Sequence, residues 1–238
     1  MKNIIKFFKT WKSKWKHLLG NKSYKFSLII GVISLITATF IMKKTSAFVD
    51  NEMYPAVGDL ILDAINTVNV EFLFVWGFYS IIASIFIYPI FFKPEIAPFM
   101  LKTFAIMMVV RSIAISLTHV GPPAGFFYDQ MSDLINNPLK NLFFRNDLFF
   151  SGHTAFPFLA FLVFKETKFR WFMLAASILM GITVLLMHVH YSIDVFAAFF
   201  IAHGVYTITD KIFNKLNLRF AKHIKQMMAI NHQSLRKK

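Results

Sequence analysis

The sequence predicts an all-α protein that crosses a membrane several times. Of the 238 residues, 56% are hydrophobic and 30 are phenylalanines, with a mean hydropathy of +0.55. This composition is too apolar for an ordinary soluble domain. The apolar residues also gather in long runs, and a helix needs about 20 of them to cross a bilayer. We therefore expect a polytopic membrane protein with six transmembrane helices.

Six apolar stretches account for these helices. They cover residues 26–42, 70–92, 98–118, 153–164, 171–187 and 190–209. The fourth is short, although its flanking residues can extend it. The first is closed by Lys43-Lys44 with no small-residue cleavage site after it, which favours a retained span over a signal peptide. We divide the chain into a basic segment (1–25), one six-span membrane domain (26–210) and a basic tail (211–238).

The distribution of charge predicts on which side of the membrane the termini lie. The net charge is +14, with eight basic residues in residues 1–25 and eight more in residues 211–238. The longer loops, 43–69 and 119–152, hold most of the acidic residues. Basic segments that flank apolar helices stay on the cytoplasmic side, where they meet anionic lipid. Both termini are therefore expected to be cytoplasmic, and the charge indicates membrane anchoring and not a nucleic-acid surface.

The N-terminal segment has a pattern of its own. Apolar residues such as Ile4, Phe8, Trp11 and Trp15 alternate with lysines at near-helical spacing. This pattern is typical of an amphipathic helix that lies in the membrane interface. A disordered basic tail is the alternative.

Two polar strings interrupt the apolar runs. Ser151-Gly152-His153-Thr154 begins the fourth stretch, and His188 to Asp194 begins the sixth. Ionisable groups at a membrane helix are costly and mark functional sites. In the predicted topology both strings lie on the extracytoplasmic face, and Arg111 lies in the outer half of the third stretch. These separated polar residues are therefore expected to converge at one side of the membrane.

The residue types favour transfer of a phosphoryl group. His190 and Asp194 are four residues apart, so on a helix they share a face and can hydrogen-bond. A carboxylate that holds one imidazole nitrogen leaves the other as nucleophile or base. Ser151-Gly152 precedes His153 at a helix start, where backbone N–H groups can bind phosphate, and Arg111 can neutralise its oxygens. The chain has no cysteine, which excludes thiolate catalysis and zinc–thiolate sites.

Other interpretations of these residues stay open. A membrane histidine can serve helix packing, and Arg111 can snorkel or pair with a loop acid. As a second option, a metal ion could be bound by His188, His190 and Asp194. A transporter or a structural membrane protein is a third, but a proton relay would place its ionisable groups near the middle of the membrane. His119, His203 and Asp210 are expected to be structural, with Asp210 at the end of the last span.

Both strings resemble signatures of the sphingomyelin synthase family within the type 2 lipid phosphate phosphatases. Residues 146–154 are similar to its Gly-Asp…Ser-Gly-His-Thr motif, and residues 188–195 to its His-x-His-Tyr-(Ser/Thr)-x-Asp-Val motif. Arg111, Thr118 and the Pro122-Pro123 turn resemble an upstream Arg-x6-Thr stretch, and residues 54–63 weakly resemble a first-loop motif. Asn146 stands where the family has Gly. Thr183-Val184 stands where classical phosphatases have Ser-Arg, which favours the synthase-like branch.

The resemblance implies a six-span enzyme with an extracytoplasmic site and no metal or other cofactor. By this resemblance, His190 is the nucleophile that Asp194 orients, and His153 is the acid and base, supported by Asp147. Arg111, Ser151 and Gly152 would bind or support the phosphate. The expected substrates are phospholipids or sphingolipids, with a ceramide-type or diacylglycerol-type alcohol as acceptor. A lipid phosphate phosphatase, with water as acceptor at the same residues, is the alternative.

Overall fold

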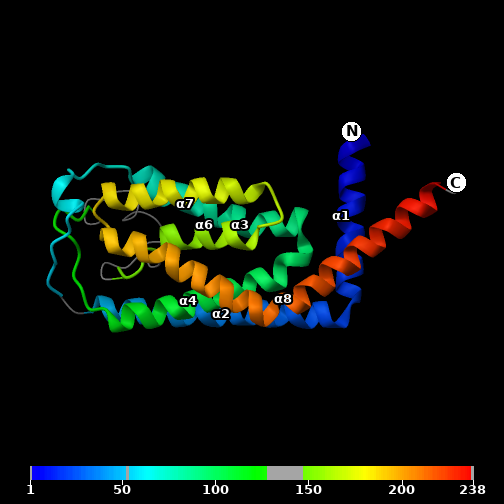
Figure 1. Ribbon diagram of the computed structural model, residues 1–238, viewed down its shortest axis with the longest axis horizontal. Coiled ribbons are helices and arrows are strands. Elements are labelled where there is room, and N and C mark those ends of the chain that lie inside the picture. Colours follow the sequence, from blue (N-terminus) through cyan, green and yellow to red (C-terminus); the bar gives the residue numbers. More distant parts are fainter. Residues whose placement is uncertain (1, 52–53, 128–146, 237–238) are drawn as a thin grey trace.

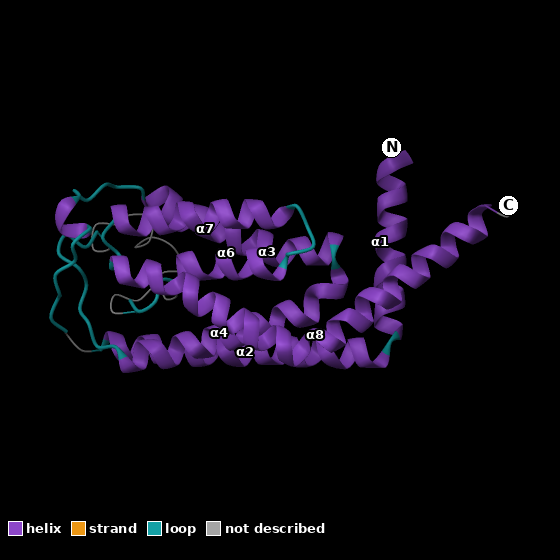
Figure 2. Ribbon diagram, viewed as in Figure 1, coloured by secondary structure: helices purple, strands orange, loops and turns teal. Residues whose placement is uncertain are grey.

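Seven α-helices make up most of the part of the chain that the computed structural model describes, which is residues 2–51, 54–127 and 147–236. They are α1 (Lys2–Gly20), α2 (Lys22–Asp50), α3 (Phe78–Phe92), α4 (Ala97–Leu117), α6 (Gly152–Val163), α7 (Phe169–Leu186) and α8 (Ser192–Arg236). A π-helical turn at Leu73–Gly77 leads into α3, and short 3-10 turns lie at Leu62–Ala64 and Pro94–Ile96. Within the described residues, Figure 2 shows helices and loops only.

Five helical segments are long and apolar enough to cross a membrane. They are Lys22–Asp50, Leu73–Phe92, Pro94–Leu117, Phe169–Leu186 and Ser192–Phe213. This confirms an all-helical, multi-pass membrane protein. The fourth expected span forms α6, whose 12 residues reach only about 18 Å at 1.5 Å per residue. The sixth span and the cytoplasmic position of both termini therefore stay predictions.

Helices α2, α3, α4, α6 and α7 run along one common direction, whereas α1 lies across it (Figure 1). The termini lie at one end of this bundle. The connecting segments around residues 54–72 and 118–127 lie at the opposite end, which we call the loop end. Most of the N-terminal segment forms helix α1, and its place in the membrane interface stays a prediction. The indole N–H groups of Trp11 and Trp15 both donate to the carbonyl of Ile90, at 2.8 and 2.9 Å, and fix α1 to the end of α3.

Small residues allow close packing between the helices. A Cβ atom at Gly31 of α2 would lie 3.0 Å from Leu101 Cβ of α4. Likewise, a Cβ at Gly181 of α7 would lie 3.1 Å from a Val195 methyl of α8. The Ser177 hydroxyl of α7 donates to the carbonyl of Thr154 at 2.8 Å, which ties α7 to the first turn of α6. These contacts hold the starts of α6 and α8 close together.

Two helices extend beyond their expected bounds. Helix α2 continues eight residues past the expected end at residue 42, to Asp50. Helix α8 continues past Asp210 to Arg236, so Asp210 does not end the helix and the basic tail is largely helical. Hydropathy marks only the apolar part of a helix, whereas its backbone hydrogen bonds can continue into polar sequence. The extension of α2 matters most, because it carries α2 to the loop end.

Candidate active site

The start of α8 holds the paired His190 and Asp194. Nδ1 of His190 lies 3.3 Å from Oδ2 of Asp194, and both residues are buried. The expectation that a helix presents the two on one face needs correction, because α8 begins at Ser192 and His190 lies in the turn before it. Asp194 Oδ2 also accepts the Tyr191 N–H at 2.9 Å, which caps the first turn. The pair forms across this turn.

Loop residues hold the same turn from outside. Oδ2 of Asp59 accepts the Ser192 N–H at 2.6 Å, and its Oδ1 accepts the N–H groups of Ile61 and Leu62. Burial raises the pKa of the Asp59 carboxyl, but the hydrogen bonds from Ser192, Leu62 and Ile61 outweigh burial and hold this pKa below its ordinary value. The charged carboxylate is therefore the form that fastens residues 59–62 to α8.

Tyr191 makes a second connection between the turn and the loops. Its hydroxyl donates to the carbonyl of Gly121 at 2.8 Å and accepts the Val57 N–H at 3.1 Å. A Cβ at Gly121 would lie 1.9 Å from the Tyr54 carbonyl oxygen, so the two loop segments meet where only glycine fits. The two loop segments that contain Val57 and Gly121 thus both contact Tyr191, the residue next to His190.

His153 lies in the first turn of α6. The Ser151 hydroxyl oxygen caps this helix by accepting the Thr154 N–H at 3.4 Å. The imidazole of His153 is flanked by Phe74 and Phe78, whose ring centroids are 4.3 and 4.0 Å from its own. Its centroid lies 6.4 Å from that of His190. The structure thus brings together two histidines that are 37 positions apart in the sequence.

Arg111 and Asp147 form an ion pair beside the histidines. Nη1 of Arg111 donates to Asp147 Oδ1, and Nη2 donates to the Asp147 carbonyl at 3.1 Å. The other oxygen of the carboxylate, Oδ2, accepts the Ser46 hydroxyl at 3.0 Å. The pairing of Arg111 with a loop acid, left open by the sequence, is what the structure has. Support of His153 by Asp147 stays a prediction.

Gly152 lets Arg111 lie against the start of α6. A Cβ atom at this position would be 3.3 Å from Arg111 Nε and 3.8 Å from its Cζ. Nε has no hydrogen-bond partner among the described residues, although it is buried. A donor of this kind, next to the N–H groups of a helix start, is suited to an anionic oxygen. Arg111 is thus adjacent to Gly152, whereas phosphate binding by Arg111, Ser151 and Gly152 stays a prediction.

His188 is not placed to share a metal ion with His190 and Asp194. Its Nδ1 lies 2.8 Å from the carbonyl of Ala124, and its backbone φ is 52°. Asp194 meanwhile engages His190. Among the described residues, no group of three or more His, Asp or Glu side chains is arranged to hold a metal ion.

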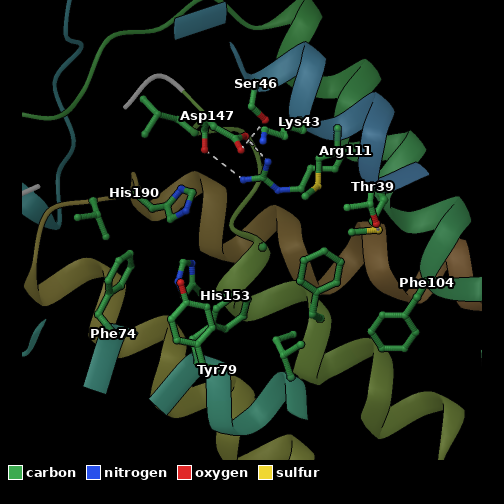
Figure 3. Close-up of a pocket in the computed structure, with 18 of the residues that line it drawn as sticks. Thr39, Lys43, Ser46, Phe74, Tyr79, Phe104, Arg111, Asp147, His153 and His190 are labelled. Atoms are coloured by element: carbon green, nitrogen blue, oxygen red, sulfur yellow. Dashed lines mark hydrogen bonds and ion pairs between the residues drawn. The ribbon is translucent and has the colours of Figure 1, made fainter. Parts of the chain in front are cut away.

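A cavity of about 290 Å³ connects these residues (Figure 3). Among the described residues, its polar side chains are those of Thr39, Lys43, Ser46, Tyr79, Arg111, Asp147, His153 and His190. Its apolar lining includes Leu35, Ile82, Phe86, Phe104, Met108 and Phe156. In Figure 3, Phe104 lies on the opposite side of the cavity from His190. The cavity therefore offers polar groups in one region and hydrocarbon-like surface in another.

Several of these residues were not anticipated from the sequence. Lys43 and Ser46 come from the part of α2 beyond the apolar stretch. In the sequence, the Lys43-Lys44 pair indicated only the end of a span. Phe74 and Phe78 lie in an apolar run that gives no sign of contact with His153. Lys43 and Ser46 are three residues apart, so they share a face if the helix continues past residue 42. This spacing was the one available signal.

The comparisons with known proteins bear on the segment that holds both histidines. No curated protein and no solved structure gives a significant match to the chain. One family model, described as PAP2 superfamily C-terminal, matches residues 146–212. The matched segment contains α6, α7 and the first part of α8, and therefore both histidine strings. Residues 146–212 are thus similar to the PAP2 superfamily C-terminal family, over less than half of the chain.

Proposed function

We propose that the protein is a membrane-embedded phosphotransferase that moves a phosphate-bearing head group from one lipid to a lipid alcohol of the ceramide or diacylglycerol type. The observation that carries the proposal is the pair of histidines, His153 and His190, at one cavity with Arg111. The similarity of residues 146–212 to the PAP2 superfamily C-terminal family supports this reaction class. The site would face the extracytoplasmic side.

In the first step, His190 attacks the phosphorus of the bound phospholipid. Asp194 accepts the hydrogen bond from Nδ1, which leaves the Nε2 lone pair as the nucleophile. A P–N bond forms while the P–O bond to the diacylglycerol breaks. Protonated His153 gives its proton to the departing alkoxide, so that diacylglycerol leaves as a neutral alcohol. Arg111 Nε and the N–H groups at the start of α6 stabilise the charged phosphoryl oxygens.

The second step reverses these roles. The hydroxyl of the acceptor lipid gives its proton to neutral His153 and attacks the phosphorus. A new P–O bond forms as the P–N bond to His190 breaks. Both histidines then return to their starting protonation states, with the head group on the acceptor. The two-step route needs no group beyond the side chains named here.

The shape of the cavity supports a lipid substrate. The polar lining can receive a phosphate-bearing head group, while Leu35, Phe86 and Phe104 can contact acyl chains. Lys43, at the polar lining, is solvent-exposed. Entry of water beside Lys43 would give a second candidate function, a lipid phosphate phosphatase in which water replaces the acceptor alcohol.

Purified protein reconstituted with a phospholipid labelled in its head group tests the proposal. With ceramide or diacylglycerol added, transfer gives a new labelled lipid. Release of labelled phosphate or phospho-alcohol into water indicates hydrolysis instead. His203→Ala, on the exposed side of α8, is the matched histidine control and is expected to keep full activity. Turnover of neither kind, in protein that remains folded, would overturn the proposed reaction class.

A further inference from the structure

Two adjacent lysines on α2 have different surroundings. Successive residues of a helix point about 100° apart. The Lys43 side chain lines the cavity beside Ser46 and reaches toward the Arg111–Asp147 pair (Figure 3). Lys44 is absent from the cavity lining, and its Nζ lies 5.6 Å from the ring centroid of Phe40. The chain thus carries a lysine inside the site and a matched one outside it.

The charges that line the cavity do not balance. Among the described residues, its charged side chains are those of Lys43, Arg111 and Asp147, in addition to the two histidines. Asp147 is engaged by Arg111 and Ser46. Lys43 makes no ion pair with any residue in the described part of the chain. With neutral histidines, the described part of the lining therefore has an excess of one positive charge, and the protonated His153 of the first step adds another.

A zwitterionic head group would fit these charges poorly. Its ammonium group would enter a cavity in which the one carboxylate from the described residues is already paired, close to the Lys43 and Arg111 cations. Aromatic faces can replace a carboxylate in binding quaternary ammonium groups. However, Phe74 and Phe78 already pack against the His153 ring. A phosphodiester whose alcohol has no amine would instead neutralise the excess charge.

We propose that Lys43 binds the lipid head group, and that the site takes phospholipids of net negative charge in preference to zwitterionic ones. This inference rests on the proposed function for the location of the substrate, and it adds the class of head group. Lys43 supplies a second cation near the phosphate, from a helix that lies outside the matched family segment. The exposed Lys43 ammonium is expected to contribute mainly to binding of the charged ground state.

Competing substrates in the full-length protein test this preference. Phosphatidylglycerol and phosphatidylcholine with identical acyl chains are presented in nonionic detergent micelles, so that the surface charge is diluted. We expect kcat/KM to be at least about tenfold higher for phosphatidylglycerol. Lys43→Gln should remove most of this preference by raising KM for phosphatidylglycerol about tenfold with little change in kcat. Lys44→Gln, the matched control, should leave kcat/KM unchanged for both lipids.

A binding measurement separates this inference from the proposed reaction. The Tm of the wild type should rise more with phosphatidylglycerol than with phosphatidylcholine, and Lys43→Gln should abolish that difference. Equal turnover of the two lipids, or equal loss in both lysine variants, would overturn the anionic preference while the reaction class stands. Differential binding without any turnover would instead support the preference and overturn the reaction. Neither turnover nor differential binding would overturn both.

Discussion

Oδ2 of Asp194 lies 3.3 Å from Nδ1 of His190 and, at the same time, 2.9 Å from the backbone nitrogen of Tyr191. One carboxylate oxygen therefore both orients the imidazole and caps the first turn of α8. The two roles explain why the pair forms although His190 is not helical. The position of the histidine ring is thereby coupled to the start of a membrane helix.

Replacement of Asp194 should separate these roles. Asp194→Asn retains an oxygen that can accept the Tyr191 N–H, but it loses the charge that stabilises the tautomer and the cation of His190. We expect kcat to fall on the order of 10²–10⁴-fold, with KM and Tm close to the wild type. Asp194→Ala should lower kcat by the same factor as Asp194→Asn. It should also lower Tm, because the cap is lost. An Asp194→Asn enzyme with near-normal kcat would contradict the proposed orientation of His190.

The two histidines should differ in the intermediate that they permit. His190→Ala removes the nucleophile, so neither turnover nor labelled protein is expected after incubation with phosphate-labelled lipid. His153→Ala removes the acid and base, so steady-state turnover should also fall at least about 10²-fold. Acid-labile, base-stable phosphoryl label should form on wild-type protein quenched during turnover. Label that persists in His190→Ala would place the nucleophile elsewhere.

The sequence predicted the parts of this molecule that depend on local pattern. Apolar runs indicated the membrane helices, and the spacing of His190 and Asp194 indicated a pair. Contacts set by tertiary packing were not predictable in this way. Examples are the rings of Phe74 and Phe78 against His153, and the hydrogen bond that the Ser192 N–H donates to Asp59. Lys43 was missed for another reason, since hydropathy indicates where the apolar surface ends and not where the helix ends.

Gly152 offers a test of the phosphate site that leaves every charged group in place. In Gly152→Ala, the new methyl group would lie 3.3 Å from Arg111 Nε and occupy the space in which we place a phosphoryl oxygen. We expect kcat/KM to fall about tenfold or more, with Tm close to the wild type, because the Arg111–Asp147 pair is retained. Gly204→Ala is the matched control, because a Cβ there meets nothing within 4 Å. Steady-state kinetics of the two variants decide the point, and equal activities would exclude a phosphate beside Gly152.

Asp59 should make the stability of the loop end depend on pH. Its pKa is lower in the folded protein than the value of about 3.9 for a free carboxyl group, because backbone N–H groups from Ser192, Leu62 and Ile61 bind the charged form. The stabilisation is therefore complete above the unfolded pKa and is lost as the pH falls through the folded pKa. Asp59→Asn should lower Tm at pH 7, and the difference from the wild type should shrink below about pH 4. Asp63→Asn, at an exposed neighbour in the same loop, should have little effect at either pH. A Tm difference for Asp59→Asn that persists unchanged at pH 3 would show that its charge does not hold the loop to α8.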